Sequence, residues 1–532
     1  MKNDHNTQTA LRGSGIESRK ILPQVILRRG RGARNARTCD RFLVGGLYAR
    51  INYMAKTLSI IDTKDQVGQE VELYGWVGNR RDHGKLIFID LRDRTGVVQV
   101  VFTPHQADPL TAKNGGGLGA GQAPSLYDIA QRLRTEWVVR IRGKINERPE
   151  KMVNPELPTG KIEIEPLELE ILNEAVTPAI AVDTDGYEIG EESRMKYRYL
   201  DLRRERLARN LSNRHRVMQF IRNWLDDNKF TEVETPVLTK STPEGARDYV
   251  VPSRLYPGKF YALPQSPQQY KQLLMAAGVE KYFQFARCFR DEDTRGDRQP
   301  EFTQLDLEMS FVEREDVMAL NEELLITLVE KLYPEKKIQE VPFPRLSYKE
   351  AMEKYDTDRP DLRKDKDDKD LLAFCWVIDF PFFEKNKGGA WTFTHNPFSA
   401  PMPEHKDELL DGENLENILT SQYDVTLNGL EIGGGSIRSH ESKVLRKVFE
   451  IIGIDEIENN FGHMLQALDS GTPPHGGIAW GFDRLMSVLQ NEPNIREVIA
   501  FPKTGDARDL MMNSPSELDK KQLKELHIKT EK

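Results

Sequence analysis

The segment Phe289–Phe311, FRDEDTRGDRQPEFTQLDLEMSF, concentrates groups that could bind an anionic ligand. Its second half alternates, which predicts a strand with two different faces. One face carries Phe302, Gln304, Asp306 and Glu308; the other carries Thr303, Leu305, Leu307, Met309 and Phe311 and is an ordinary core face. Arg290 and Glu292 share one phase of the incoming strand. An arginine, carboxylates and one aromatic ring on a sheet floor suit ATP bound with a metal ion.

A second segment, YDVTLNGLEIGGGSIRSH at Tyr423–His440, predicts a hairpin that turns at Asn428-Gly429. Asp424 and Glu431 fall on its polar face and could hold one divalent cation between the strands. Three glycines follow, which let the backbone approach a ligand, and Arg438 then adds a cation. The alternative interpretation is a glycine-rich hairpin with surface charges.

A third segment, HGGIAWGFDRLMSVL at His475–Leu489, predicts a strand of small residues that turns into a helix. Arg484 lies in the first helical turn, where acidic residues are usually preferred. An arginine there is favourable if it reaches an anion that the helix terminus also attracts. A solvated arginine is the alternative, and Arg290 in the first segment favours the anion site.

Taken together, these groups fit the activation of a carboxylate by ATP. The attacking carboxylate is already an anion, so the site needs no general base; it must neutralise charge and align the attack on the α-phosphate. This chemistry agrees with the lack of a recognisable nucleophilic Ser or Cys motif and of a GxxxxGK[ST] loop in the sequence.

The composition limits the class of protein. With 532 residues the chain can form two to four domains, and 38% hydrophobic and 30% charged residues fit a globular protein without a membrane-spanning run. Three widely spaced cysteines argue against a disulfide framework or a zinc site and favour a reducing, cytoplasmic environment. Residues 1–53 carry a net charge of about +8 in a chain whose total is −8, which predicts a disordered basic extension; an RNA-binding arm and a transit peptide are the alternatives.

The strands and helices that must position these residues divide into two groups. From about Glu70 to Glu165 the chain reads as five short strands, which predicts an OB-fold barrel. Residues 211–228 have helical spacing, the strand FTEVETPVL follows, and further strands and helices predict an α+β domain with a largely antiparallel sheet. The predicted organisation is a basic extension over 1–53, a barrel domain over 54–175, a linker over 176–205 and a catalytic domain over 206–532.

Three motifs in the same order resemble those of class II aminoacyl-tRNA synthetases: Trp224–Leu238, Phe289–Phe311 and Gly476–Leu485. Over about residues 57–532 the chain is similar to the bacterial-type aspartyl-tRNA synthetases. The resemblance implies a class II catalytic domain, with an antiparallel sheet flanked by helices, and a homodimer with Pro236 at its interface. It further implies that ATP activates L-aspartate as an adenylate and that a tRNA then accepts the aspartyl group.

The resemblance also implies roles for individual residues. Arg290 would bind the α-phosphate and the aspartate α-carboxylate, and Arg484 the γ-phosphate; these two are the predicted catalytic residues. The other predicted ATP contacts are Glu292, Gln299, Phe302, Glu431, Gly481, Phe482 and Asp483. Asp424 and Glu431 would hold Mg²⁺.

For the amino acid, PQSPQQYKQL at Pro264–Leu273 resembles the family's substrate-pocket signature. The implied aspartate contacts are Glu244, Ser266, Gln268, Lys271, Arg290, Asp306, His395 and Arg438. Lys271 and Arg438 would favour a β-carboxylate over a neutral or cationic side chain, which opposes asparaginyl- and lysyl-tRNA synthetases as rivals.

In the barrel, the resemblance implies that Phe88 stacks on the central anticodon base while Arg81 and Gln99 read its neighbours. His83 suggests that tRNA(Asn) is charged as well as tRNA(Asp), whereas Lys151 points to strict tRNA(Asp) specificity. The usual bacterial insertion is predicted to be absent near residues 363–371. Two alternatives remain. An inactive RNA-binding paralogue is opposed by the retained arginines, and a synthetase-like asparagine synthetase is opposed by the barrel, which it would leave unexplained.

Overall fold

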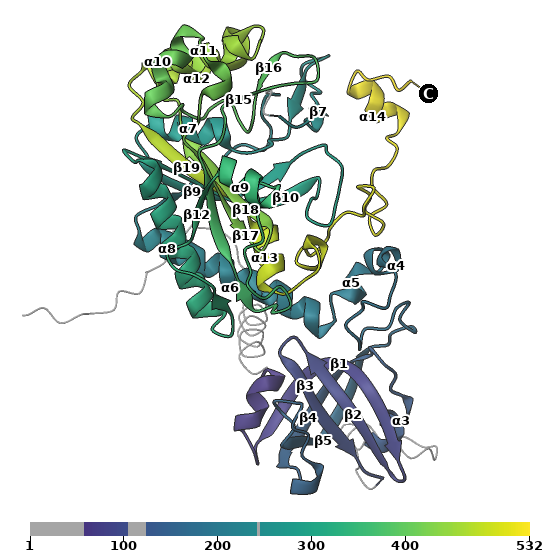
Figure 1. Ribbon diagram of the computed structural model, residues 1–532. Coiled ribbons are helices and arrows are strands. Elements are labelled where there is room, and N and C mark those ends of the chain that lie inside the picture. The colour runs from purple at the N-terminus through teal and green to yellow at the C-terminus, as the bar shows by residue number, and fades with distance from the viewer. Residues whose placement is uncertain (1–57, 105–123, 242–244, 532) are drawn as a thin grey trace, which may run out of the picture. The chain divides into compact units, whose positions relative to one another are not determined.

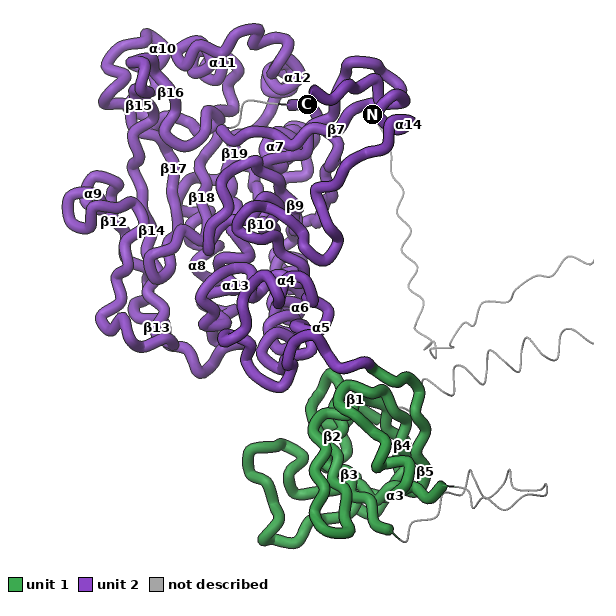
Figure 2. The backbone as a smooth tube through the Cα atoms, turned by 90° about the vertical axis from the view of Figure 1, so that its right-hand side faces the viewer, with its two compact units in different colours: residues 1–175 green, residues 176–532 purple. Residues whose placement is uncertain are grey.

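The computed structural model describes residues 58–104, 124–241 and 245–531, and the chain forms two compact units, Met1–Ala175 and Val176–Lys532 (Figure 2). Each unit has its own core and is described by itself. Residues 1–53 and Glu244, for which the sequence analysis predicts roles, lie outside the described residues.

The first unit is a closed five-stranded barrel with the strand order β1-β2-β3-β5-β4 (Figure 1), which confirms the OB-fold prediction. Its strands are β1 (Glu70–His83), β2 (Leu86–Asp93), β3 (Gly96–Phe102), β4 (Val138–Glu147) and β5 (Ile162–Asn173), and its helical segments are η1 (Ile60–Asp65), α3 (Leu126–Arg132) and η2 (Glu150–Met152). Alternation places Ile87, Ile89 and Leu91 inside the barrel and turns Phe88 and Asp90 outward. Gly75 permits close strand packing, since a Cβ there would lie 2.4 Å from the Arg92 carbonyl oxygen.

The second unit is built on an eight-stranded sheet with the order β12-β14-β17-β18-β19-β10-β9-β6. The strands are β12 (Arg345–Ser347), β14 (Phe374–Ile378), β17 (Gln422–Leu427), β18 (Leu430–Ile437), β19 (His475–Gly481), β10 (Glu301–Ser310), β9 (Lys281–Phe289) and β6 (Thr231–Glu232). The five inner pairings are antiparallel, and the two outermost pairings are parallel. The α+β prediction with a largely antiparallel sheet is therefore confirmed.

Helices pack on this sheet (Figure 1). The longest are α6 (Glu205–Asp227) and α8 (Arg314–Leu332), which contribute Ile221, Leu225 and Leu328 to the main core. The other helices are α4 (Glu191–Lys196), α5 (Arg198–Asp201), α7 (Gln268–Ala276), α9 (Tyr348–Tyr355), α10 (Lys406–Asp411), α11 (Ser442–Ile451), α12 (Ile457–Asp469), α13 (Phe482–Leu489) and α14 (Lys520–Glu525), with the 3-10 turns η3 (Pro403–His405), η4 (Leu415–Asn417) and η5 (Ile495–Glu497). Three short ribbons pair β7 (Val250–Pro252) with β8 (Phe260–Ala262), β11 (Lys337–Ile338) with β13 (Leu371–Leu372), and β15 (Phe383–Lys385) with β16 (Trp391–Phe393). Among the described residues, no helix has both the length and the apolar character that crossing a membrane requires.

Three local predictions were wrong. The predicted strand FTEVETPVL shortens to the two residues of β6, and Pro236, which lacks an N–H, cannot donate a ladder hydrogen bond further along this segment. Arg290 and Glu292 lie beyond the end of β9, in the loop that leads to β10. Phe311 is not a core residue: β10 ends at Ser310, and Phe311 has a φ of 60° and is 70% exposed.

Candidate active site

A cavity of about 520 Å³ in the second unit is lined by side chains from distant parts of the sequence. Arg290, Arg438 and Arg484 all line it, although 194 positions separate the first from the last. Of the predicted ATP and aspartate contacts, the lining also includes Ser266, Gln268, Lys271, Glu292, Gln299, Phe302, Asp306, His395, Glu431, Gly481 and Asp483. The strands β10, β18 and β19 carry several of these residues side by side in the centre of the sheet.

Two cations and two carboxylates form a buried network at one end of the cavity. Lys271, on α7, places its Nζ 3.0 Å from Asp306 Oδ2 and 3.2 Å from Glu308 Oε2. Arg438 donates through Nε to Glu308 Oε1 at 2.9 Å and through Nη2 to Glu308 Oε2 at 3.2 Å. Ser436 Oγ and the Gly477 carbonyl oxygen accept two further hydrogen bonds from the Arg438 guanidinium. The network fixes two positive side chains at the cavity wall.

The two carboxylates titrate in opposite directions. Burial raises the pKa of Asp306 to about 6, even though Lys271 favours its charged form. Burial acts in the same sense on Glu308, but the charges of Arg438 and Lys271 outweigh it and lower the pKa of Glu308 to about 2. Asp306 Oδ1 is buried and accepts no hydrogen bond within the part of the chain that the structure describes. Glu308 is therefore a fixed counter-ion, whereas Asp306 keeps an unused acceptor.

Arg290 and Phe302 lie together on another part of the wall. The Arg290 guanidinium is 5.2 Å from the centre of the Phe302 ring, and its buried Nε makes no hydrogen bond to any described residue. Gln299 is held by the chain at Lys503, because its Oε1 accepts from the Lys503 N–H at 2.7 Å and its Nε2 donates to the Lys503 carbonyl. A flat ring and an arginine with free hydrogen-bonding capacity can accommodate an aromatic base and a phosphate.

Arg484 connects two loops around the cavity. Its Nη1 donates to the Glu431 carbonyl oxygen at 3.0 Å, and its Nε donates to the Asp297 carbonyl oxygen at 3.2 Å. The Asp297 carboxylate lies 3.4 Å from Nη2. The guanidinium therefore stands between the loop after β9 and the hairpin of β17 and β18, with part of its surface facing the cavity.

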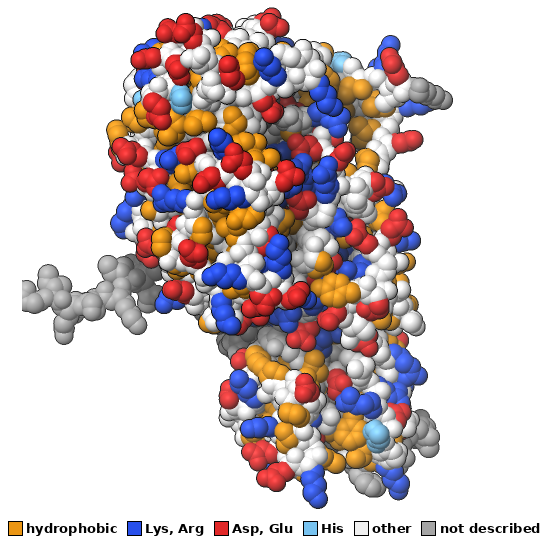
Figure 3. Space-filling view, viewed as in Figure 1, with side chains coloured by type: hydrophobic (Ala, Val, Ile, Leu, Met, Phe, Trp, Pro, Cys, Tyr) orange, Lys and Arg blue, Asp and Glu red, His pale blue; other side chains and the backbone are white. Residues whose placement is uncertain are grey.

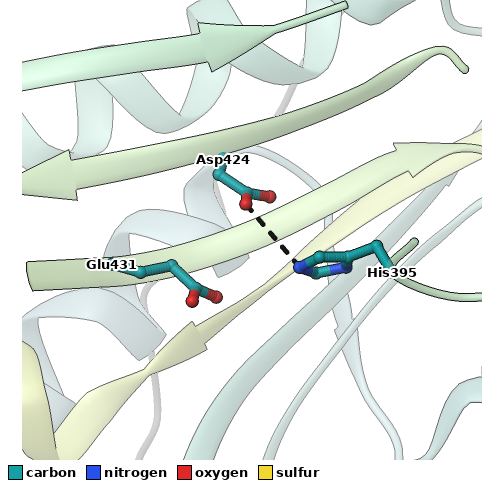
Figure 4. Close-up of side chains that lie close together, drawn as sticks. All are labelled: His395, Asp424 and Glu431. Atoms are coloured by element: carbon teal, nitrogen blue, oxygen red, sulfur yellow. Dashed lines mark ion pairs between the residues drawn. The ribbon is translucent and has the colours of Figure 1, made fainter. Parts of the chain in front are cut away.

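That hairpin contributes two members of a cluster of three metal-competent side chains, which we call the hairpin cluster; the third, His395, comes from the segment after β16. His395, Asp424 and Glu431 each have one ligand atom within 4.8 Å of the others (Figure 4). The predicted turn is confirmed, with positive φ at both Asn428 and Gly429. His395 Nε2 is 3.6 Å from Asp424 Oδ2, and burial raises the pKa of Asp424 to about 7 despite that histidine.

Some predicted contacts are not brought to the cavity as expected. The Phe482 ring does not line the cavity: it is fully buried in the main core, edge-on to Phe285 and under the Arg214 guanidinium. Asp424 lies behind the cavity wall, next to His395 and Glu431. Asp483 reaches the wall, but its oxygens are used within the protein: one accepts from Arg214 at 2.6 Å and the other from the Thr303 N–H at 2.9 Å.

The first unit has an outer face that carries the other predicted residues. Arg81 is paired with Phe88 across β1 and β2, and Gln99 is paired with Asp90 across β2 and β3. The His83 ring meets the Phe88 ring edge-on at 5.9 Å. Basic, hydrophobic and histidine side chains stand next to one another on the visible face of this unit (Figure 3). Lys151 is exposed in η2.

Comparison with known proteins gives two family matches. Residues 190–505 match the family described as tRNA synthetases class II (D, K and N), and residues 71–176 match an OB-fold nucleic acid binding domain. The chain belongs to the class II tRNA synthetases. Enzymes of this family use ATP with a divalent metal ion.

Named relatives of this synthetase are similar over most of their length. It is 43% identical to the aspartate–tRNA(Asp/Asn) ligase of Rubrobacter xylanophilus, in an alignment that covers 87% of this chain and 94% of the relative. It is 39% identical to the aspartate–tRNA(Asp/Asn) ligase of Dehalococcoides mccartyi strain CBDB1, in an alignment that covers 90% of this chain and 99% of the relative. The first alignment runs over 589 positions although this chain has 532 residues, so the relative holds segments without a counterpart here. Asparaginyl-tRNA synthetase of Pyrococcus horikoshii, solved with asparaginyl-adenylate, shares the fold with a TM-score of 0.65 at 23% identity, covering 83% of this chain and 96% of that one.

Three residues of the synthetase were missed as site residues by sequence reasoning. Glu308 was placed on the polar face of its strand, but its position between Lys271 and Arg438 depends on contacts with residues 37 and 130 positions away. Gln265 is hydrogen-bonded to both backbone groups of Ala246 and to Asp248, which holds that loop against the cavity. Arg148 is buried near Glu163, Asp90 and Arg81, and its Nη2 has no hydrogen-bond partner among the described residues.

Proposed function

We propose that this synthetase attaches L-aspartate to tRNA through an aspartyl-adenylate. The observation that carries the proposal is the buried pair of cations, Lys271 and Arg438, at the wall of a cavity that also contains Arg290 and Arg484. The relatives named aspartate–tRNA(Asp/Asn) ligase support the same assignment. A β-carboxylate satisfies such cations, whereas the amide of asparagine would leave them poorly matched.

In the first step the aspartate α-carboxylate attacks the α-phosphate of ATP, and pyrophosphate leaves. Arg290 binds the α-phosphate and the attacking carboxylate, so it brings the two anions together and offsets their repulsion. Phe302 stacks on the adenine, Gln299 and Glu292 position the nucleotide, and Arg484 binds the γ-phosphate. In the second step the 3′-hydroxyl of the terminal adenosine attacks the mixed anhydride, and AMP leaves.

The hairpin cluster fits the divalent ion that the family uses. Its donors include two carboxylates, which Mg²⁺ prefers, and the backbone at Gly434 passes so close to Asp424 that a Cβ would lie 2.7 Å from Oδ1. Asp424 and Glu431 would hold Mg²⁺, which when bound neutralises phosphate charge. Because imidazole is an uncommon Mg²⁺ ligand, His395 is assigned to the aspartate substrate beside the ion.

In the first unit, Phe88 stacks on a base of the anticodon, while Arg81, Gln99 and Arg148 bind its neighbours. The proposal rests on an outward aromatic ring surrounded by donors, on a barrel that matches a nucleic-acid-binding family. The substrates are tRNA(Asp) and tRNA(Asn), because His83 lies against Phe88 and the relatives' names give both tRNAs. Lys151 is assigned to the same discrimination.

The remaining parts of the proposal concern assembly and location. A homodimer is expected to form around Pro236, because Val237 and Leu238 beside it are 45% and 53% exposed in the single chain. Tyr256 and Phe260 add exposed apolar surface in the same unit. Sedimentation at micromolar concentration should give twice the mass of the chain. We propose a cytoplasmic location, a compartment that supplies both ATP and tRNA.

The decisive experiment is ATP–pyrophosphate exchange with each of the twenty amino acids. Aspartate alone should support exchange; exchange with asparagine or lysine instead would refute the assignment. Charging purified tRNA(Asp) and tRNA(Asn) then tests the dual specificity. The variant His83→Leu should lose aspartylation of tRNA(Asn) while it retains that of tRNA(Asp), and an enzyme that never charges tRNA(Asn) would refute this part alone.

A further inference from the structure

The segment 494–505, which we call the C-terminal strap, holds the loop of the nucleotide site. The Ile495 N–H donates to the Gly296 carbonyl oxygen at 3.0 Å, and Arg496 donates to the Arg295 carbonyl oxygen. Two hydrogen bonds join Lys503 to Gln299, and Thr294 donates to the Gly505 carbonyl oxygen. Ile495 itself lines the cavity. The conformation of loop 294–299 therefore depends on where the strap lies.

The other side of the strap is bound by the chain that enters the second unit. Arg198, on α5, donates to three strap carbonyl oxygens, those of Arg496, Ile499 and Ala500, at 2.8–2.9 Å. Arg194, on α4, binds both oxygens of Glu497, at 3.0 and 2.6 Å. Arg206, on α6, adds a third contact to Glu497 at 2.9 Å. The short helices α4 and α5 follow each other directly along the chain and contact each other (Figure 1).

These contacts are buried, which makes them specific. The side chains of Arg194, Arg198, Arg206 and Glu497 are all at least 94% buried, and the three arginines are positively charged groups that need acceptors. Asp201, fully buried, accepts from Arg194 and Arg198 and completes the network. A buried ion pair that loses one partner leaves an uncompensated charge, so the network has one favourable arrangement. A movement of α4 and α5, which we call the linker helices, would therefore move the strap.

We propose that Glu497 is a positioning residue for ATP, which couples the linker helices α4 and α5 to the nucleotide loop through the strap. The inference rests on the proposed function, since it takes loop 294–299 to bind ATP. Glu497 does not touch the cavity; it fixes the strap, and the strap fixes Gly296 and Gln299. Its effect should consequently appear in the binding of ATP and not in the binding of aspartate.

The test is the variant Glu497→Gln in the full-length enzyme, which keeps the shape of the side chain and removes its charge. In aspartate-dependent ATP–pyrophosphate exchange, we expect the KM for ATP to rise about 3- to 30-fold while the KM for aspartate changes less than about 2-fold. Because Glu497→Gln could unfold the protein, Arg496→Ala provides a second variant; it removes the contact with the Arg295 carbonyl and should raise the KM for ATP in the same way.

The matched control is Glu322→Gln. Glu322, on α8, also accepts hydrogen bonds inside the second unit, from the Phe343 N–H and Trp376 Nε1, but it does not contact the strap. Its KM for ATP should equal that of the wild type. A folded Glu497→Gln and Arg496→Ala with wild-type KM for ATP would overturn the inference. Failure of the proposed function would look different, because the wild-type enzyme itself would then show no aspartate-dependent exchange.

A double-mutant cycle with Gln299→Ala adds a readout that a purely structural effect would not produce. If the strap acts through Gln299, the two substitutions together should raise the KM for ATP by less than the product of their separate effects. Effects that multiply would show that Glu497 does not act through Gln299 and would overturn that step of the inference.

Discussion

Replacing Lys271 by methionine tests the basis of amino-acid selection. The Lys271 side chain is 2% exposed and lines the cavity, and its Nζ lies 3.0 Å from Asp306 and 3.2 Å from Glu308. Methionine has a similar length and no charge, and its sulfur tolerates a buried position. In this variant Arg438 alone remains to receive the β-carboxylate.

The expected size of the effect follows from one lost hydrogen bond between charged groups. Such a bond contributes about 1.5–3 kcal/mol, which corresponds to a loss of about 10- to 150-fold in kcat/KM for aspartate. The KM for ATP should change by less than about 2-fold, because among the described residues Lys271 forms its ion pairs with Asp306 and Glu308 and not with the nucleotide site. The preference for aspartate over asparagine should fall by a similar factor.

The control is Lys336→Met. The Lys336 side chain is also 2% exposed, and its Nζ is also paired with an acid, Asp370 at 3.1 Å, but Lys336 does not line the cavity. Aspartate-dependent exchange and thermal unfolding should be measured for both variants. Equal kinetics for Lys271→Met and wild type would refute the assignment of the cation pair, and an equal loss in both variants would trace the effect to general destabilisation.

Three further results are expected. Arg484→Ala should strongly raise the KM for ATP with an unchanged unfolding temperature, and unchanged exchange would contradict its role. Phe88→Ala should weaken aminoacylation of tRNA by about 1–3 kcal/mol, the cost of one lost stack, while exchange without tRNA stays at the wild-type rate. Glu308→Gln should destabilise the fold at neutral pH, because the pKa of Glu308 falls from an ordinary 4.5 to about 2 in the folded state. This contribution, about 3 kcal/mol, is present above pH 4.5 and is lost as the pH falls through 2, so urea unfolding of the two proteins should converge at low pH.

Local sequence patterns predicted much of the fold. The alternation in β2 and β10 and the Asn428-Gly429 turn specify which side chains face together, since side-chain direction in a strand has a period of two residues. Asp306 and Glu431 were therefore placed on polar strand faces without knowledge of the sheet order. Arg484 was assigned from its place in the first turn of a predicted helix, and Arg290 lines the cavity although its predicted place within a strand was wrong. Family resemblance supplied Ser266, Gln268 and His395, for which the local pattern gave no separate signal.

The failures have a common physical cause, namely partners that are distant in sequence. Phe482 follows a glycine at a helix start, where a ring could equally face a ligand or the core; Phe285 and Arg214 decide this, and neither is near it in the chain. The strap network joins Arg194 and Arg198 to positions about 300 residues away, and three of its acceptors are backbone carbonyls, which have no sequence signature. Such contacts become visible only when the chain is folded.

Asp306 and Glu308 show why a pattern alone could not assign their roles. Both lie on the same face of β10, two residues apart, and both are buried acids, so the sequence treats them as equivalent. Glu308 lies between two cations and has both oxygens bonded, which holds it ionised. Asp306 has one cation and one unused oxygen, and its pKa rises to about 6. When the surroundings of two neighbouring acids shift their pKa values in opposite directions, the two acids can serve different functions. Glu308 therefore fixes the cations in place, and Asp306 is the acid whose charge and free oxygen can respond when aspartate enters.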